Sequence, residues 1–179
     1  LMVAVFLGLH LARLRLPALQ ALFEASAYVP QAVTWQGVLL GPAFHNHWFH
    51  LLGDQLSLYV FGALCEIILG PALFWLVAGA GLWLSNPLTQ LAYWPWLKAY
   101  WPAAYAHFAA EGDYGSSNAV FALVGAYCAL LRRKGWLLLP FSVYGAFICY
   151  ARQSLIALHH PLSLALGYGL IALLLRHRK

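Results

Sequence analysis

The chain has 179 residues, of which 63% are hydrophobic and only 8% are charged, and its formal net charge is +5. An ordinary soluble domain could not bury so much apolar surface, and the basic residues gather at two points of the chain, which excludes a nucleic-acid-binding face. The composition predicts one all-α polytopic membrane domain over 1–179, with about six helices of roughly 20 residues each.

Apolar runs predict the six membrane spans in chain order. They lie at about 1–11, 49–69, 71–85, 117–131, 136–151 and 155–175. The first run is short for a complete span, and the chain begins at Leu1 rather than at a methionine. We therefore expect the natural N-terminus to lie upstream of this residue.

The basic residues predict the orientation of the spans. Six of the ten lysines and arginines form two clusters, namely Arg132, Arg133 and Lys134, and Arg176, Arg178 and Lys179. The positive-inside rule makes both clusters cytoplasmic, and the even number of predicted crossings between them agrees with this. We expect a cytoplasmic C-terminus, a location in a bacterial inner membrane, and outer connections after the first and third spans.

Both outer connections carry aromatic residues. The first, about 12–48, is apolar enough to lie on a bilayer. The second contains "LAYWPWLKAYWPAAYAHF", from Leu91 to Phe108. Its Trp and Tyr residues favour the headgroup region, and its prolines exclude a seventh regular span. We expect an interfacial or re-entrant segment, for which a plain aromatic belt without chemistry is a sufficient explanation.

The three cysteines have no spacing typical of a disulfide framework or a metal site. Cys65, Cys128 and Cys149 are scattered inside apolar runs, with no Cys-x-x-Cys pair among them. We interpret them as packing residues, and we expect neither a metal ion nor a cofactor.

Polar residues gather at the predicted outer starts of three spans. His50 and Asp54 share one face of the second span, Ser117 begins the fourth, and His159 and His160 begin the sixth. Ionisable groups at such depths are costly and usually functional. A serine, an imidazole and further donors at one depth would suit a hydrolase. The serine alone is weak support, because small residues also let helices pack closely.

Three motifs contain these residues. They are His50-x-x-x-Asp54, Gly115-Ser116-Ser117-Asn118 and His160-x-x-Ser163-x-x-x-Gly167. In their order and spacing, over nearly the whole chain, they resemble the motifs of the rhomboid family of intramembrane serine proteases: His-x-x-x-Asn on the second helix, Gly-x-Ser-Gly on the fourth and His-x-x-Gly-x-x-x-Gly on the sixth. Trp35 followed by Gln36 is also similar to a Trp-Arg pair in the first outer loop of that family.

The resemblance implies a six-span rhomboid-like bundle and a role for each motif residue. Ser117 would be the nucleophile and His160 its general base. Oxyanion donors would be the Ser117 backbone N–H and the His50 side chain. Residues that pack the dyad would be Phe121, Gly115 and Gly167. The implied substrates are single-span membrane proteins with helix-destabilising residues near the outer membrane face, and the lipid bilayer is the other implied partner.

The motifs depart from the family pattern at Asp54, Asn118 and Ser163. The last two add little volume and could hydrogen-bond across the helix pair. Asp54 replaces an asparagine, so it would act either as a neutral donor or as an ionised partner that orients His50. Because of these departures, a non-proteolytic rhomboid-like protein that binds transmembrane clients remains an alternative. A small transporter or channel is a second one, although the chain lacks repeated broken helices.

Overall fold

The structure is a computed structural model that describes residues 2–131, 140, 143 and 159–177. Over these residues the chain is helical, and the pairing between extended segments is limited to one isolated bridge, Tyr28 with Asp113. The helices are α1 (Met2–Arg13), α2 (Pro17–Ala25), α3 (Trp35–Leu39), α4 (Trp48–Ser57), α5 (Ala63–Leu69), α6 (Pro71–Ala92), α7 (Trp94–Tyr100), α8 (Pro102–Phe108), α9 (Ser117–Leu130) and α11 (His159–His177). A 3₁₀ turn (Gly41–Ala43) precedes α4, and a π-helical turn (Leu58–Gly62) joins α4 to α5.

The all-α prediction is confirmed for the described residues, whereas the six-span bundle stays a prediction. By length and hydropathy, two described helical segments could cross a membrane, Trp48–Leu69 and Pro71–Tyr100. A third could do so if α1 and α2, which meet at 112°, form one broken span. The helix α9 is apolar but shorter. The predicted span at 136–151 lies outside the described residues, except for Pro140 and Val143.

The third predicted span ends too early at residue 85. The helix α6 continues to Ala92, and Ser85, Asn86 and Thr89 lie inside it, fully or almost fully buried. Polar residues lower the local hydropathy, but these three face the interior of the protein. A polar residue therefore does not mark the end of a span when neighbouring helices provide its hydrogen bonds.

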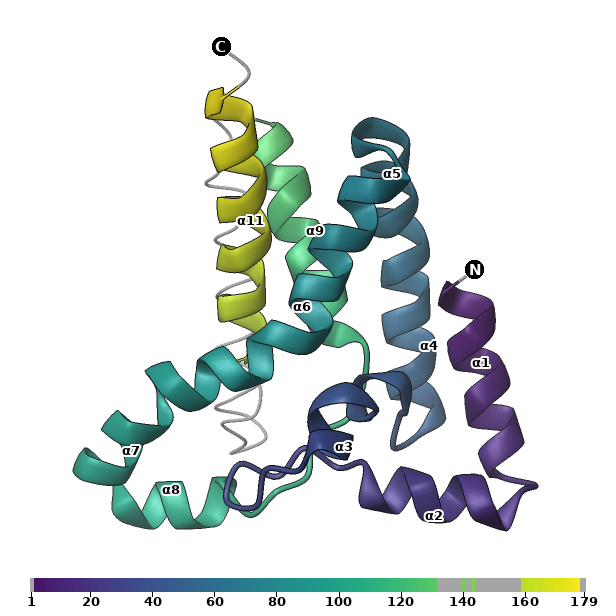
Figure 1. The fold of residues 1–179 in the computed structure, drawn as a ribbon, viewed down its shortest axis with the longest axis vertical. Helices are drawn as coiled ribbons and strands as arrows, with labels where there is room; N and C mark the ends of the chain where they lie inside the picture. Colours follow the sequence, from purple (N-terminus) through teal and green to yellow (C-terminus); the bar gives the residue numbers. More distant parts are fainter. Residues whose placement is uncertain (1, 132–139, 141–142, 144–158, 178–179) are drawn as a thin grey trace.

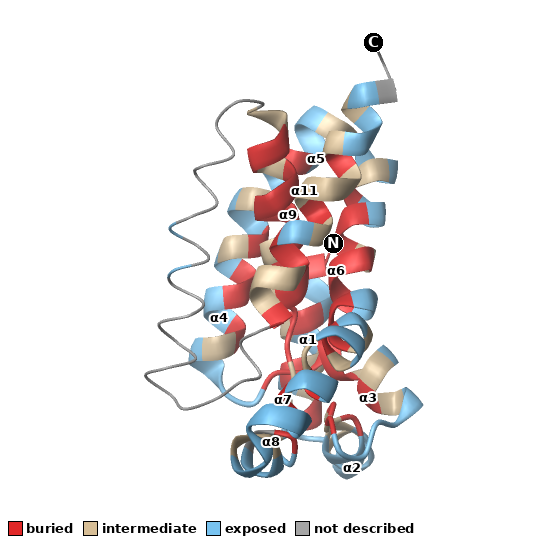
Figure 2. Cartoon of the chain, turned by 90° about the vertical axis from the view of Figure 1, so that its left-hand side faces the viewer, coloured by how far each residue is buried: buried red, intermediate tan, exposed pale blue. Residues whose placement is uncertain are grey.

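The centre of the bundle is formed by α6, α9 and α11, which pack through glycines. A Cβ atom at Gly125 would collide with the backbone of Leu164, and one at Gly167 would collide with the backbone of Ala122. These two glycines let α9 and α11 approach almost backbone to backbone. Figure 2 shows how burial concentrates along these helices.

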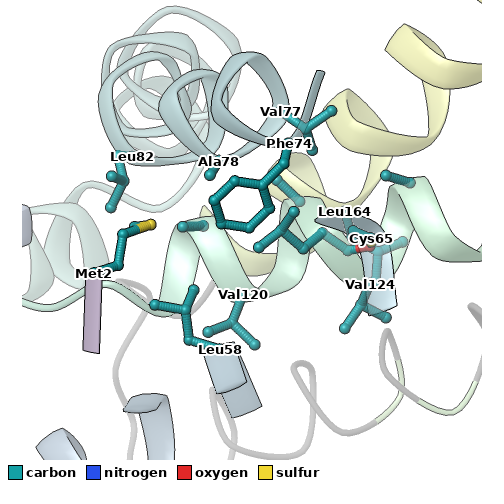
Figure 3. Close-up of a cluster of buried hydrophobic side chains, with 14 of the residues drawn as sticks. Met2, Leu58, Cys65, Phe74, Val77, Ala78, Leu82, Val120, Val124 and Leu164 are labelled. Carbon is teal, nitrogen blue, oxygen red and sulfur yellow. The ribbon is translucent and has the colours of Figure 1, made fainter. Parts of the chain in front are cut away.

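The apolar core extends from this centre towards α4 and α5. Figure 3 shows Phe74 of α6 among apolar side chains of the neighbouring helices, including Cys65 and Leu164. Cys65 and Cys128 are buried free thiols, which confirms the packing interpretation for these two. Cys149 lies outside the described residues.

Short helices lie across one end of the bundle. The helices α2 and α8 run sideways there, below the starts of α4, α9 and α11 in the view of Figure 1, and α7 slopes from the end of α6 down to α8. The segment 91–108 is not one regular helix, because a break at Trp101 separates α7 from α8. Trp94 and Leu97 form a small core with Ala109, while the neighbouring Tyr100 is 67% exposed. The location of this segment at the membrane surface stays a prediction.

Candidate active site

Ser117 and His160 meet at the end of the bundle where α9 and α11 begin. The Ser117 Oγ and the His160 Nε2 are 3.0 Å apart. Phe121, one turn after the serine, lies flat on the imidazole, with ring centroids 4.2 Å apart and planes 7° from parallel. The three residues therefore adopt the relation predicted from the sequence. In a neutral imidazole that accepts from the serine hydroxyl at Nε2, the other ring nitrogen carries the proton.

The turn before α9 brings His50 to the same place. Gly115 has a φ of +116°, which lies in a backbone region that residues other than glycine rarely adopt. A Cβ atom here would lie 2.7 Å from the His50 ring and 3.3 Å from the Asp54 Oδ2. Because α9 begins at Ser117, the N–H of this residue has no acceptor within the helix and lies at the positive end of the helix dipole.

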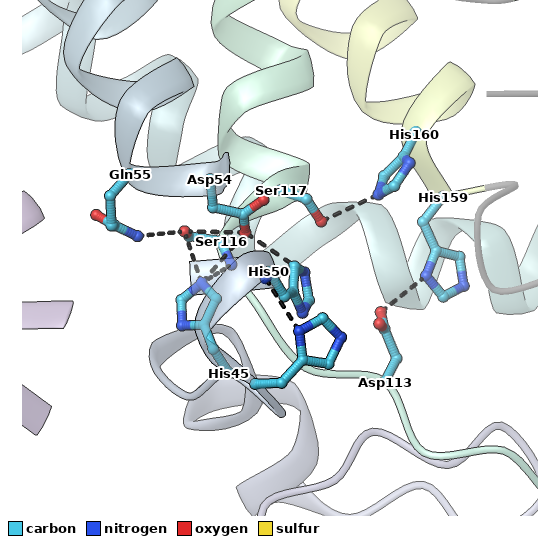
Figure 4. A network of polar contacts seen from close by, with 10 residues as sticks. His45, His50, Asp54, Gln55, Asp113, Ser116, Ser117, His159 and His160 are labelled. Atoms are coloured by element: carbon cyan, nitrogen blue, oxygen red, sulfur yellow. Dashed lines mark hydrogen bonds and ion pairs between the residues drawn. The ribbon is translucent and has the colours of Figure 1, made fainter. Parts of the chain in front are cut away.

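Asp54 lies behind His50 in a buried polar network (Figure 4). Its Oδ2 is 3.2 Å from the His45 Nε2 and 3.6 Å from the His50 Nε2. The Ser116 hydroxyl donates to the same oxygen over 3.3 Å, and the Gln55 amide donates to that hydroxyl over 3.2 Å. One carboxylate oxygen thus faces the Ser116 hydroxyl and two imidazole nitrogens, whose donor or acceptor roles depend on the tautomer. These contacts place Asp54 where it can orient His50, and its two predicted roles, neutral donor or ionised partner, both stay open.

Asn118 and Ser163 occupy two of the positions where the motifs depart from glycine, and both are hydrogen-bonded. The Asn118 amide donates to the Asn86 side-chain oxygen of α6 over 2.8 Å. Its own side-chain oxygen is 3.1 Å from the Ser163 hydroxyl of α11. That hydroxyl also lies 2.7 Å from the Ser85 hydroxyl. The larger side chains therefore form a polar junction between three helices.

Asp113 is a site residue that the sequence analysis missed. Its carboxylate lies 3.2 Å from the Nδ1 of the buried His159. The Asp113 backbone N–H and carbonyl both pair with Tyr28, over 2.9 and 3.0 Å. No spacing rule links residues so far apart in the sequence. Only the excess of polar residues in the loop before Ser117 could have indicated it.

Tyr28 fixes the outer loop against these elements. Its side chain is almost completely buried, and its hydroxyl donates to the Asn86 carbonyl over 3.2 Å. Burial, and to a lesser extent the nearby Asp113 carboxylate, raise the pKa of Tyr28 to about 12. The phenol is therefore a neutral donor at physiological pH, and it links the loop after α2 to α6.

An open cavity of about 640 Å³ adjoins the dyad. The polar residues that line it include Ser117, His160, His50 and Asp54. Its other walls are mostly apolar and include Phe49, Phe61, Val120, Phe121 and Val124. Such a cavity can hold an apolar chain with one of its polar groups beside the serine hydroxyl.

Comparisons of the chain with protein-family models, curated proteins and solved structures give no match. The rhomboid resemblance therefore rests on the motif residues alone. Every predicted site residue lies at or beside the dyad or in the helix packing that supports it. Within the described ranges, no group of three His, Cys, Asp or Glu side chains could hold a metal ion.

The site has the parts required for nucleophilic catalysis. A serine hydroxyl bonded to an imidazole can lose its proton as it attacks a carbonyl carbon. An N–H at a helix start and a nearby imidazole can stabilise the resulting oxyanion. The phenyl ring of Phe121 restricts rotation of the His160 ring. These features support acyl-transfer chemistry at Ser117.

Proposed function

We propose that this chain is a rhomboid-type intramembrane serine protease. Its substrates are single-span membrane proteins, which it cleaves near the outer membrane face without a cofactor. The observation that carries the proposal is the 3.0 Å contact between the Ser117 Oγ and the His160 Nε2 at the common end of α9 and α11. In this proposal the chain forms a six-span bundle in a bacterial inner membrane, with its C-terminus in the cytoplasm.

The reaction proceeds in two steps through a covalent intermediate. The Ser117 Oγ attacks the scissile carbonyl carbon while the His160 Nε2 accepts the hydroxyl proton. The Ser117 N–H and the His50 side chain donate to the oxyanion. His160 then gives its proton to the leaving amine as the peptide C–N bond breaks. Water hydrolyses the ester, again with His160 as the base.

The surroundings of the dyad support a membrane-embedded substrate. The cavity beside Ser117 is apolar over most of its walls, including Phe61 and Val124. A peptide bond in a regular helix is shielded by its own hydrogen bonds and side chains. A substrate segment that unwinds readily would therefore expose its carbonyl to Ser117 more easily, which is the reason for the proposed preference for helix-destabilising residues.

The proposal is tested with the purified protein in liposomes that contain a single-span reporter. The wild type should release a fragment, and Ser117→Ala and His160→Ala should release none. His107→Ala, on the exposed side of α8, serves as the control and should cleave at the wild-type rate. Cleavage by Ser117→Ala at the wild-type rate would refute the proposal. Binding of the reporter without cleavage by the wild type would support the client-binding alternative.

A further inference from the structure

Three side-chain contacts join the start of α9, with the loop before it, to the first turn of α11. They are Asp113 with His159 at 3.2 Å, Ser117 with His160 at 3.0 Å, and Asn118 with Ser163 at 3.1 Å. The central contact is the proposed dyad. The other two lie on either side of it along both segments. Figure 4 shows the first two of these contacts next to each other.

We propose that the outer two pairs, Asp113–His159 and Asn118–Ser163, are positioning pairs that set the distance between the nucleophile and its base. The proposal deepens the proposed function and rests on it. It assigns a role to Asp113, which no motif contains. It also gives a positioning role to Asn118 and Ser163, the two residues that replace glycines of the family motifs.

The packing of α9 against α11 explains why such pairs are needed. The two helices touch through Gly125 and Gly167, where a Cβ atom would collide with the facing backbone. A contact between such smooth surfaces holds the helices close, but it offers few large side chains that interlock and fix their register. Hydrogen bonds between defined atoms supply the missing restraint. Their geometry tolerates only a few tenths of an ångström of sliding.

The first positioning pair is anchored on both sides. The Asp113 main chain is held by its two bonds to Tyr28. The His159 side chain is 1% exposed and also packs edge to face against the Tyr28 ring, with centroids 6.0 Å apart. His159 directly precedes His160. A restraint on the buried His159 ring therefore also limits movement of the adjoining backbone that carries the base.

The second pair is anchored by the third helix of the centre. The Asn118 amide is fixed by Asn86 over 2.8 Å, so its side-chain oxygen has one orientation towards Ser163. The single hydroxyl proton of Ser163 is shared between the Asn118 side-chain oxygen at 3.1 Å and the His159 carbonyl oxygen at 2.7 Å. The second pair is thereby connected to the first through the backbone at the start of α11. Together they hold both ends of the segment that contains the base.

The test compares Asp113→Ala with Asp113→Asn in the full chain. Asparagine keeps an oxygen that accepts from His159, whereas alanine removes it. For cleavage of the single-span reporter, we expect Asp113→Ala to lower kcat by about 10- to 100-fold with KM within about threefold, because small displacements of reacting groups are this costly. Asp113→Asn should stay within about threefold of the wild type in kcat. Ser163→Ala, which deletes one oxygen from the second pair, should also lower kcat by at least about tenfold.

The outcomes separate this inference from the proposed function. If the wild type cleaves and Ser117→Ala does not, but Asp113→Ala and Ser163→Ala cleave at the wild-type rate, the positioning pairs are refuted and the dyad stands. An Asp113→Asn variant as slow as Asp113→Ala would also refute positioning, because the acceptor is retained. If the wild type shows no cleavage that depends on Ser117, both proposals fail. Should Asp113→Ala not fold, the comparison of Ser163→Ala with the wild type decides the matter.

Discussion

Replacement of Gly167 by alanine should separate α9 from α11 and disable the dyad. The added Cβ would collide with the Ala122 carbonyl oxygen and lie 2.8 Å from the Ala122 Cα. Non-bonded carbon atoms prefer separations of about 3.5–4.0 Å, so the helices must move apart by about 1 Å at this point. Backbone atoms cannot rotate away as a side chain would. The collision must therefore be relieved by movement of a whole helix.

This movement should lower both the free energy of unfolding and the rate of cleavage. Overpacking in a closely packed interior costs about 1–3 kcal/mol, and the helix propensity of alanine returns up to about 1 kcal/mol. The Ser117–His160 contact is 3.0 Å long, and a lengthening of about 1 Å takes it beyond hydrogen-bond range. A misplacement of this size lowers catalytic rates by about 100-fold. The loss of activity should thus exceed the loss of stability.

Gly169 provides a matched control on the same helix. A Cβ atom at this position would meet nothing within 4 Å. Gly169→Ala should therefore match or exceed the wild type in melting temperature and cleave the reporter at the wild-type rate. Thermal unfolding in detergent and reporter cleavage in liposomes measure the two quantities. If Gly167→Ala and Gly169→Ala behave alike in both assays, the close-packing argument is wrong.

Three further predictions concern the turn, the outer loop and the surface helices. Gly115→Ala should abolish reporter cleavage while the chain still folds, because its Cβ would displace the His50 ring that lies 2.7 Å away; wild-type cleavage would contradict this. Tyr28 has a pKa of about 12 in the folded state against about 10 when unfolded, so stability should fall by up to about 2–3 kcal/mol as the pH rises from 10 to 12. Tyr28→Phe should lose less over this range in pH-dependent melting, and an equal loss would contradict the assignment. A spin label at Tyr100→Cys, with the native cysteines replaced, should collide with oxygen more often than with an aqueous nickel chelate. More frequent collisions with the nickel chelate would place α7 in water and contradict this prediction.

The dyad could be predicted from the sequence because its signals are local. Ser117 begins an apolar run directly after a glycine turn, and His160 begins another run with small residues spaced along it. The direction of each span is enough to predict that Ser117 and His160 lie at the same side of the membrane. The stacking of Phe121 on the imidazole follows from its position one helical turn after the serine.

The supporting contacts could not be predicted because they join residues distant in sequence. Asp113 meets His159 and Asn86 meets Asn118 only after three helices have packed. The hydropathy of α6 ended the predicted span at residue 85, although the following polar residues are buried by neighbouring helices. For Asp54 the sequence allowed two roles, and it could not predict the contacts of its Oδ2 with His45, His50 and Ser116.

The central claim is that His160 activates Ser117 as a nucleophile, and chemical labelling tests it most directly. The adjacent Ser116 is a built-in control, because it is buried and its hydroxyl donates to Asp54. After reaction of the detergent-solubilised protein with a fluorophosphonate, peptide mass spectrometry should locate one adduct on Ser117. Ser117→Ala should give none, and His160→Ala should react at least about 100-fold more slowly. An adduct on Ser116, or equal labelling of His160→Ala and the wild type, would contradict the account.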